Sequence, residues 1–301
     1  MANEVQKTTG GIKPVDMLKS VINAPSVQEQ FKNAMGGHKD AFVASLIELY
    51  TGDKALQSCK PQLIVAEALR AATMRLPINK ALGFAYIVVY NNNQKMPDGS
   101  WQKVPTPTFI PGYKGYIQLA MRTGEYKTIN ADIVYEGEIS GFDKLSGTIN
   151  FDGQKTSDKI IGYFAYFEML NGFKKTLYMT LDEMASYALR YSPSFKGRNK
   201  PTKEALAKIA QENAPTGKVG WEGNFNDMAL KTVLRRLLGK YGYLSVEMQE
   251  AVAGDVRQEQ AQAQRNDDIE DTNVVEVDTD AEVVEVETAD AEAAESEELP
   301  Y

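Results

Sequence analysis

The sequence predicts an α+β fold, in which an antiparallel sheet with hairpins packs against helices. A helical N-terminal segment precedes this region and a disordered, acidic tail follows it. Three observations lead to this prediction. β-branched and aromatic runs fill the middle of the 301-residue chain and are interrupted by single helical stretches, a pattern typical of α+β folds rather than doubly wound ones. Helical periodicity flanks these runs on both sides. After about residue 250 the composition changes to Ala and Gln, and then to Asp, Glu and Val.

The N-terminal part predicts a flexible arm followed by helices. Residues 1–25 are polar and contain several Gly and Pro residues, so we expect a mobile arm. Apolar residues then recur every three to four positions, as expected for helices with one buried face. The expected helices cover residues 28–35, 39–50 and 61–74.

The middle of the chain predicts hairpins. Residues 85–90 and 104–110 form an expected pair of strands joined by a long loop, and Pro105 and Pro107 favour an edge position because proline cannot donate to a ladder. A helix follows over 113–123 and ends at Gly124. Asn171-Gly172 is a strong turn signal between the last two strands. The further expected strands cover 129–135, 147–151, 160–169 and 174–179.

Helices close the folded part of the chain. Thr180 and Glu183 form a capping box that opens a helix running to about Tyr191. A basic loop over 192–201, a weaker helix over 202–213 and a long amphipathic helix over 225–241 complete the series. We therefore expect three parts: a flexible arm over 1–25, a binding and oligomerisation domain over 26–250, and an acidic tail over 251–301.

The formal net charge of −8 hides two opposite parts. Residues 251–301 carry 17 acidic and 2 basic residues, a net charge of −15, and the preceding 250 residues carry 31 basic and 24 acidic residues, a net charge of +7. This asymmetry favours a body that binds a polyanion and a tail that interacts with other molecules. The tail has three open interpretations: solubility, DNA mimicry that fills the binding groove, or docking to host proteins.

The sequence also argues against several classes of site. With one cysteine, Cys59, and one histidine, His38, the chain has no disulfide framework, no structural zinc site and no HExxH centre. Gly217-Lys218 lacks the other residues of a phosphate loop, so we expect no ATP site. No long apolar stretch or signal peptide is present, so we expect a soluble, cytoplasmic protein without a membrane partner.

Carboxylates between the middle strands leave a metal-dependent nuclease open as an alternative function. Their spacing does not bring them together, and solvated turns explain them better. We expect no cofactor, with Mg²⁺ only as a modulator of nucleic-acid binding. The carboxylates in question are Asp132, Glu136, Glu138, Asp143, Asp152 and Asp158.

Three groups of cations and aromatic residues predict nucleic-acid contacts, because cations bind phosphates and aromatic faces stack on bases. The first group is in the basic loop, the second on the long helix, and the third on and near the 113–123 helix. The long helix carries no acidic residue along its basic face. The candidate residues are Arg190, Tyr191, Phe195, Lys196, Arg198 and Lys200; Lys231, Arg235 and Arg236; and Lys103, Lys114 and Arg122.

Three of these stretches, residues 77–90, 109–124 and 226–237, together resemble the RecT family of phage and prophage single-strand DNA annealing proteins. The most specific motifs are Tyr-Lys-Gly at 113–115 with Arg122 and Gly124, and Met-Ala-x-Lys-Thr-Val at 228–233 followed by Arg235-Arg236-Leu237. The resemblance covers roughly residues 45–243.

The resemblance implies a recombinase that binds single-stranded DNA without ATP, assembles into rings or helical filaments and pairs complementary strands. It also implies a partner exonuclease and a host single-strand-binding protein. The annealed duplex would remain bound, and Lys114, Arg122, Lys231, Arg235 and Arg236 would line the DNA groove. No feature of the sequence separates DNA from RNA, so an RNA-binding interaction module stays open as a second alternative.

Overall fold

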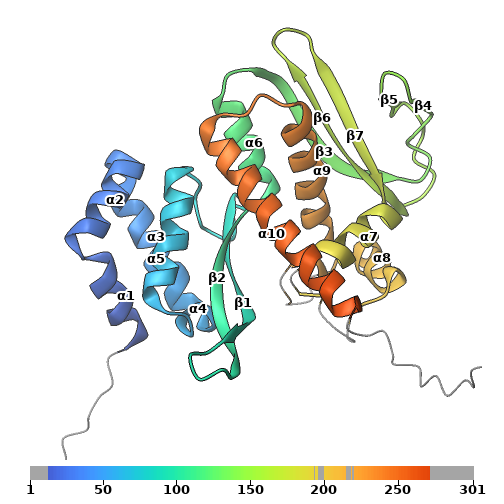
Figure 1. Cartoon of the computed structure of the whole chain (residues 1–301). Coiled ribbons are helices and arrows are strands. Elements are labelled where there is room, and N and C mark those ends of the chain that lie inside the picture. The colour runs from blue at the N-terminus through green and yellow to red at the C-terminus, as the bar shows by residue number, and fades with distance from the viewer. Residues whose placement is uncertain (1–12, 193, 196–199, 215–217, 219, 272–301) are drawn as a thin grey trace, which may run out of the picture.

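The computed structural model describes residues 13–192, 194–195, 200–214, 218 and 220–271, and it has the expected α+β architecture. The N-terminal helices form one side of the molecule and a three-stranded antiparallel sheet forms the other (Figure 1). A long hairpin and three helices, α6, α9 and α10, lie between them (Figure 1). The fold class predicted from the sequence is therefore confirmed.

The N-terminal layer begins earlier than predicted. Pro14 occupies the first turn of α1, where its missing N–H leaves no bond unmade, and Leu18 and Ile22, one turn apart, are buried. The flexible arm predicted over 1–25 is therefore wrong from Pro14 onward, while residues 1–12 lie outside the described part. The helices of this layer are α1 (Pro14–Ile22), α2 (Pro25–Met35), η1 (Gly36–His38), α3 (Lys39–Gly52), α4 (Lys54–Gln57) and α5 (Pro61–Thr73).

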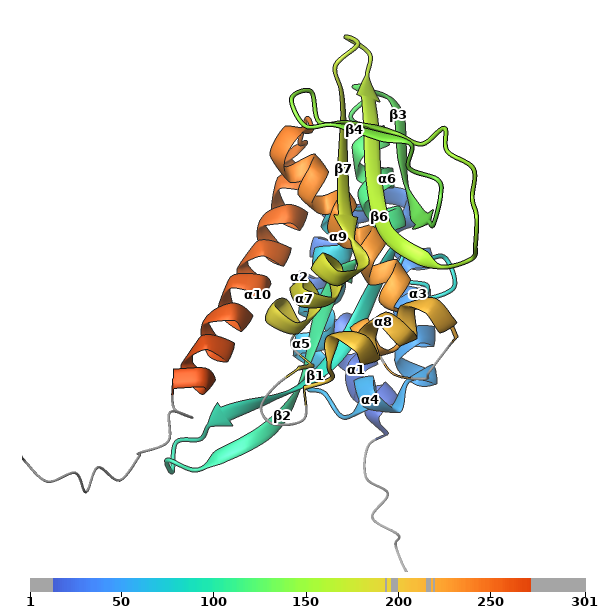
Figure 2. The ribbon, with the colours of Figure 1, turned by 90° about the vertical axis from the view of Figure 1, so that its right-hand side faces the viewer.

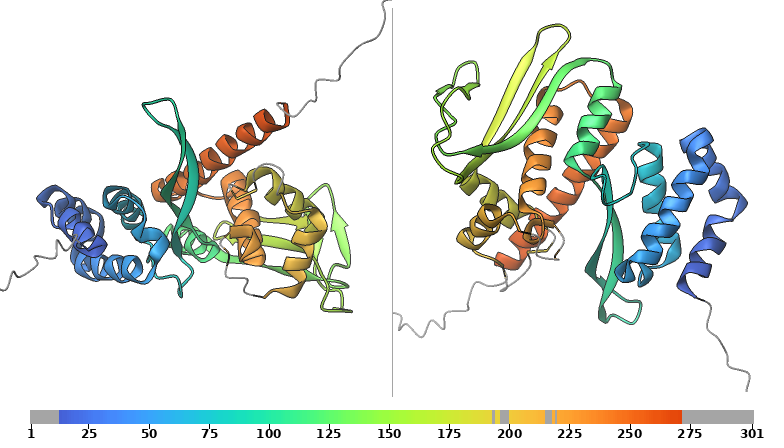
Figure 3. Two further views of the ribbon diagram at one scale, coloured as in Figure 1. Left: turned by 90° about the horizontal axis from the view of Figure 1, so that it is seen from below. Right: turned by 180° about the vertical axis from the view of Figure 1, so that it is seen from behind.

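The predicted hairpin is present, with longer strands and a tighter turn. β1 (Ala85–Lys95) pairs with β2 (Trp101–Pro111) along its whole length. The polar residues after Tyr90 extend the ladder, because pairing in an exposed hairpin uses the backbone and leaves side chains in water. The hairpin tip projects from the same side of the molecule as the C-terminal end of α10 (Figures 2 and 3).

The main sheet has the strand order β3-β6-β7, and all its pairs are antiparallel. Tyr163, Ala165 and Phe167 of β6 are fully buried on the face that α9 covers. The Asn171-Gly172 turn joins β6 to β7 as predicted, with Gly172 at a φ of 85°. The strands are β3 (Tyr126–Tyr135), β6 (Ile160–Met169) and β7 (Lys174–Thr180), and a small separate ribbon contains β4 (Gly141–Asp143) and β5 (Thr148–Asn150).

The remaining helices include two whose starts were predicted from capping residues. Thr180 and Glu183 form both bonds of the capping box, and the Thr202 hydroxyl accepts a bond from the backbone N–H of Ala205. These helices are α6 (Tyr113–Arg122), α7 (Leu181–Tyr191), α8 (Lys203–Glu212), η3 (Gly220–Glu222), α9 (Phe225–Tyr241) and α10 (Val246–Asp271).

The last helix corrects the prediction of a disordered tail from residue 251. α10 continues to Asp271, and Met248, Ala251 and Asp255 are buried along one face of it. Their spacing of three and four residues places them on one side of a helix, so α10 is held by packing despite its low hydrophobicity. Residues 272–301 lie outside the described part.

Candidate nucleic-acid interface

A small groove, with a cavity of about 50 Å³, forms where the β1–β2 hairpin, α7, α9 and α10 meet. We call it the basic groove because two predicted DNA-binding cations of α9 lie in it. Aromatic rings from three elements form much of its wall. Its lining residues are Tyr90, Ile110, Tyr187, Tyr191, Trp221, Met228, Lys231, Thr232, Arg235, Asp255, Gln258 and Glu259.

Lys231 and Arg235 are one turn apart on α9, and both are already bound to carboxylates of α10. The Lys231 ammonium lies 2.8 Å from Asp255 Oδ2. Arg235 Nη2 donates to both oxygens of Glu259, at 2.6 and 2.7 Å. The Lys231 and Arg235 side chains are only 10% and 5% exposed, so these are buried ion pairs rather than surface contacts.

Two tyrosine hydroxyls extend this network, which we call the clasp (Lys231, Arg235, Asp255 and Glu259 with Tyr116 and Tyr187). The Tyr116 hydroxyl donates to Asp255 at 2.7 Å, and Arg235 Nη2 donates to the Tyr187 hydroxyl at 2.7 Å. Burial raises the pKa of Tyr116 well above its usual value, so its hydroxyl stays a donor. Burial opposes the charge of Arg235, but Glu259, Tyr187, Tyr116 and Asp255 together outweigh burial and raise the pKa of the guanidinium.

Aromatic side chains contact one another beside the clasp, with their rings tilted. The ring centroids of Tyr187 and Tyr191 are 4.5 Å apart, and those of Tyr187 and Trp221 are 6.3 Å apart. Arg190 is exposed and its guanidinium lies 5.7 Å from the Tyr191 centroid. Trp221 is 4% exposed and packs in the core, so the half-buried rings of Tyr187 and Tyr191 are the aromatic surfaces that a base could reach. The groove therefore combines oxyanion-binding cations with aromatic surfaces, the two parts that a single nucleic-acid strand requires.

The basic loop contributes less than the sequence suggested. Phe195 is 2% exposed and packs in the core, so its ring is not available to stack on a base; the absence of a helical pattern around it concealed this packing. Lys200 is half-buried. Lys196 and Arg198 lie outside the described residues.

The third group of predicted residues does not converge on the groove. Lys103 is exposed on β2 opposite Asn93, and Lys114 is exposed in the first turn of α6. The guanidinium of Arg122 donates to the backbone carbonyls of Met74 and Arg75, at 2.8 and 2.9 Å. Arg122 therefore satisfies carbonyls that follow α5, a structural role that helix periodicity does not reveal.

Arg236 lies apart from Lys231 and Arg235, although it is their neighbour in sequence. It is exposed, its Nη1 lies 3.6 Å from Met179 Sδ, and its guanidinium lies 5.6 Å from the centroid of the Tyr187 ring. Arg236 lines a separate cleft at the edge of the main sheet.

Sequence reasoning missed the carboxylates of the clasp because it assigned them to the tail. A signal was present, because Asp255 and Glu259 are four residues apart, as are Lys231 and Arg235. Two helices with this spacing can pack side by side with each cation opposite a carboxylate. The face of α9 that lacked acidic partners in sequence receives them from α10. Tyr90, Tyr187 and Trp221 carried no separate signal.

The carboxylates considered for a nuclease site are dispersed. In the part of the chain that the structure describes, no three metal-ligating side chains form a cluster. Glu136 binds Ser157 and Lys159, Asp143 binds Ser146, and Asp158 binds Lys155. These contacts give each of the three carboxylates a local structural role.

Comparison with known proteins identifies the family. The RecT family matches residues 40–275 of the chain. The chain belongs to the RecT family. This RecT-family chain is 37% identical over 255 residues to the uncharacterized protein YqaK of Bacillus subtilis (strain 168), covering 83% of this chain and 77% of that protein. It is 28% identical over 269 residues to protein RecT of Escherichia coli (strain K12), covering 85% of this chain and 87% of that protein.

The family assignment confirms the resemblance on the Tyr-Lys-Gly and Lys-Thr-Val motifs and supports a role in recombination and annealing. The match also includes α10, which sequence analysis had left outside the resemblance. Over the described residues, no helix is both long enough and apolar enough to cross a bilayer.

Proposed function

We propose that this RecT-family protein binds single-stranded DNA in the basic groove and anneals it to a complementary strand without ATP. One observation carries the proposal: the groove already binds oxyanions. Lys231 and Arg235 hold carboxylate oxygens at 2.6–2.8 Å, next to the neighbouring rings of Tyr187 and Tyr191. Phosphate oxygens make the same charge-assisted bonds, and the rings offer surfaces on which bases stack.

Entry of a strand requires exchange, because α10 occupies the anion positions. Asp255 and Glu259 would leave Lys231 and Arg235 as phosphates arrive, so that no buried cation is left unpaired. Exchange of one oxyanion for another keeps the electrostatic energy nearly constant, so strand binding in the groove would be reversible. Under the DNA-mimicry interpretation of the acidic C-terminal region, Asp255 and Glu259 are thus the two residues that would take the place of phosphates.

Strand pairing would be driven by base pairing itself. Cations reduce the repulsion between two phosphate backbones, and assembly of several copies along a strand makes the pairing cooperative. A partner exonuclease that supplies single strands and a host single-strand-binding protein that covers them fit this role. They remain part of the proposal.

Annealing of two labelled complementary oligonucleotides, followed by energy transfer between the labels, tests the function. We expect annealing at the same rate with and without ATP. The groove variant Lys231→Met/Asp255→Asn removes both charges of one ion pair, so it leaves no unpaired buried charge and should fold. We expect this variant to lose strand binding; unchanged binding and annealing by a folded variant would remove the basic groove from the proposal. An RNA arm of the same assay measures the preference for deoxyribose.

A further inference from the structure

A second concave surface, which we call the edge cleft, lies along β7, an edge strand of the main sheet. The β4–β5 ribbon and the C-terminal half of α9 form its other walls. The cavity measures about 700 Å³. Four cations line it: Lys144 from the turn of the ribbon, Lys175 from β7, and Arg236 and Lys240 from α9.

These four cations differ from those of the clasp in having no acidic partner. Among the residues that the structure describes, none of the four forms a salt bridge. The carboxylate that lines the cleft, Glu183, is occupied by the capping box, where it accepts bonds from the backbone N–H and the hydroxyl of Thr180 at 2.8 and 3.0 Å. Four like charges around a cavity repel one another, and a bound polyanion would relieve this repulsion.

Aromatic rings accompany the cations here as well. Two ammonium groups lie near the ring of Tyr241, with Lys240 Nζ 5.0 Å and Lys175 Nζ 5.5 Å from its centroid. Phe142 is 63% exposed at the mouth of the cleft, where its burial against a ligand would be favourable. Exposed rings beside cations suit unpaired bases on a phosphate backbone.

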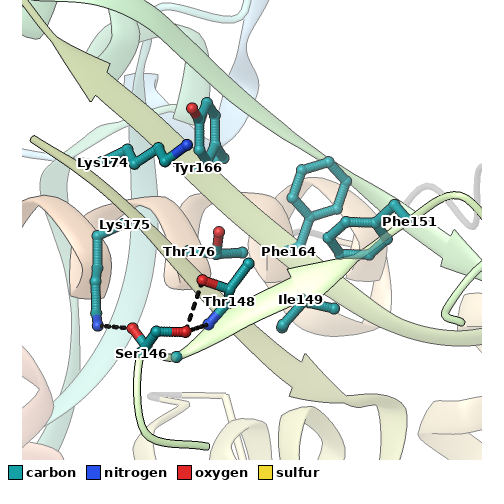
Figure 4. A pocket seen from close by; sticks show the side chains of 10 residues that line it. Ser146, Thr148, Ile149, Phe151, Phe164, Tyr166, Lys174, Lys175 and Thr176 are labelled. Carbon is teal, nitrogen blue, oxygen red and sulfur yellow. Dashed lines mark hydrogen bonds between the residues drawn. The ribbon is translucent and has the colours of Figure 1, made fainter. Parts of the chain in front are cut away.

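An aromatic pocket continues the cleft on the outer face of the sheet (Figure 4). It measures about 320 Å³ and shares Gly147, Ile149, Lys175 and Thr176 with the edge cleft. Phe151 and Phe164 lie with ring centroids 4.6 Å apart in its wall, and Lys174 reaches toward Tyr166 across it (Figure 4). A base carried by a strand in the cleft would find a flat apolar wall and a polar rim here.

The edge cleft and the basic groove lie on opposite sides of α9. Lys231 and Lys240 are nine residues apart, and at about 100° per residue this separation turns the helix by half a revolution beyond two full turns. Lys231 faces α10, whereas Lys240 faces β7 and the ribbon. Lys231 and Lys240 therefore cannot hold the same phosphate, whereas Arg236, beside the Tyr187 ring of the groove, lies between the two sites.

We propose that the edge cleft is a second binding site for single-stranded nucleic acid, which captures the incoming complementary strand before its bases pair with the strand in the basic groove. Phosphates of this strand bind Lys144, Arg236 and Lys240, and its bases stack against Tyr241 and the aromatic pocket. The inference rests on the proposed function, because a second strand matters only to a protein that anneals two.

The test uses the full chain and the variant Lys144→Gln/Lys240→Gln, which changes two exposed lysines of the cleft. The matched control is Lys203→Gln/Lys208→Gln, which removes the same charge from exposed lysines of α8 that pair with Asp182 and Glu212. Affinity for a first labelled strand is measured by fluorescence anisotropy. The annealing rate is then measured after the complementary strand is added, at several salt concentrations.

We expect the cleft variant to bind the first strand within about twofold of the wild-type affinity and to anneal about tenfold more slowly at low salt. The slope of log annealing rate against log salt should also decrease in magnitude, since two cations that release counterions on binding a strand are lost. The control should match the wild type in both measurements. An annealing rate equal to that of the control would overturn the second site. A tenfold loss of first-strand binding would also overturn it, because the cleft would then hold the first strand. Failure of the wild type to anneal would instead refute the proposed function itself.

Discussion

Arg235 shows how a residue of a basic motif can serve the fold. Its side chain is 5% exposed and bound to Glu259 and Tyr187, so its charge is balanced inside the protein. Lys240, five residues further along α9, is exposed and forms no salt bridge with the residues that the structure describes. Both are basic residues of the same helix, and the packing around each side chain determines whether it is buried and paired or exposed.

We predict that Arg235→Ala lowers the free energy of unfolding by about 3–5 kcal/mol, because it leaves the Glu259 carboxylate without its partner in a largely buried site. Lys240→Ala, the matched surface change, should alter it by no more than about 0.5 kcal/mol. Urea denaturation followed by circular dichroism measures both values. Equal effects of the two substitutions would contradict the buried clasp. A loss of DNA binding by Arg235→Ala has to be judged against this loss of stability.

Tyr126 makes the stability of the fold depend on pH in the alkaline range. Its ring is 5% exposed and its hydroxyl donates to the backbone carbonyl of Tyr243, between α9 and α10, at 2.8 Å. Burial raises the pKa of Tyr126 to about 12, above the value of about 10 in the unfolded chain. The folded state therefore keeps its proton where the unfolded state loses it, and this contribution to stability is present below pH 10 and is lost as the pH rises through about 12.

We predict that the urea midpoint falls between pH 10 and pH 12, and that Tyr126→Phe reduces the steepness of this fall. Other buried tyrosines contribute as well, so the comparison with Tyr126→Phe isolates one group. Urea titrations at several pH values provide the measurement. A Tyr126→Phe protein with the wild-type pH dependence would show that this hydroxyl does not titrate in the range.

Among the elements, those whose ends carry local signals could be predicted from the sequence. α9 runs over the predicted residues 225–241, and α7 starts at the predicted capping box. α1 and α10 could not be predicted in this way, since α1 lies among residues that usually mark loops and α10 has few apolar residues. Tertiary contacts stabilise both helices, through Leu18 and Ile22 in α1 and the clasp in α10.

The same limit applies to the candidate site. Periodicity assigned Lys231 and Arg235 to a shared face of α9 but could not show that a helix 20 residues further along covers that face. The edge cleft brings together residues of the ribbon, β7 and α9, from positions 139 to 241. No local pattern connects such positions, because strand order and helix packing determine which of them meet.

We predict that Asp255→Asn/Glu259→Gln increases affinity for single-stranded DNA about tenfold, because α10 no longer competes with phosphates for Lys231 and Arg235. The same change lowers the stability of the free protein, because these two buried cations lose their partners until a strand binds. The matched control, Glu247→Gln/Glu250→Gln, removes the same charge from exposed positions of α10. Fluorescence anisotropy with a labelled oligonucleotide compares the two proteins. An equal gain in the control would attribute the effect to net charge, and no gain in either would contradict exchange at the groove.

At the scale of the whole molecule, the hairpin and the C-terminal end of α10 project from one side (Figures 2 and 3). The chain continues beyond α10 with 11 acidic and no basic residues over 272–301. Deletion of residues 272–301 therefore changes the formal net charge from −8 to +3 and keeps the whole clasp. A cut at residue 251, the boundary suggested by composition, would remove α10 as well and mix two effects.

We predict that deletion of 272–301 speeds association with single-stranded DNA at low salt and that this gain disappears at high salt. Salt shortens the distance over which exposed charges repel DNA: the Debye length is about 10 Å at 0.1 M salt and about 3 Å at 1 M salt. The buried charges of the clasp are screened far less. Stopped-flow association rates at both salt concentrations provide the measurement. The control replaces 272–301 by an uncharged Gly/Ser segment of equal length, which should behave as the deletion does. A gain that persists at 1 M salt would show that the acidic segment acts by direct contact with the groove, as Asp255 and Glu259 do, and not by long-range repulsion.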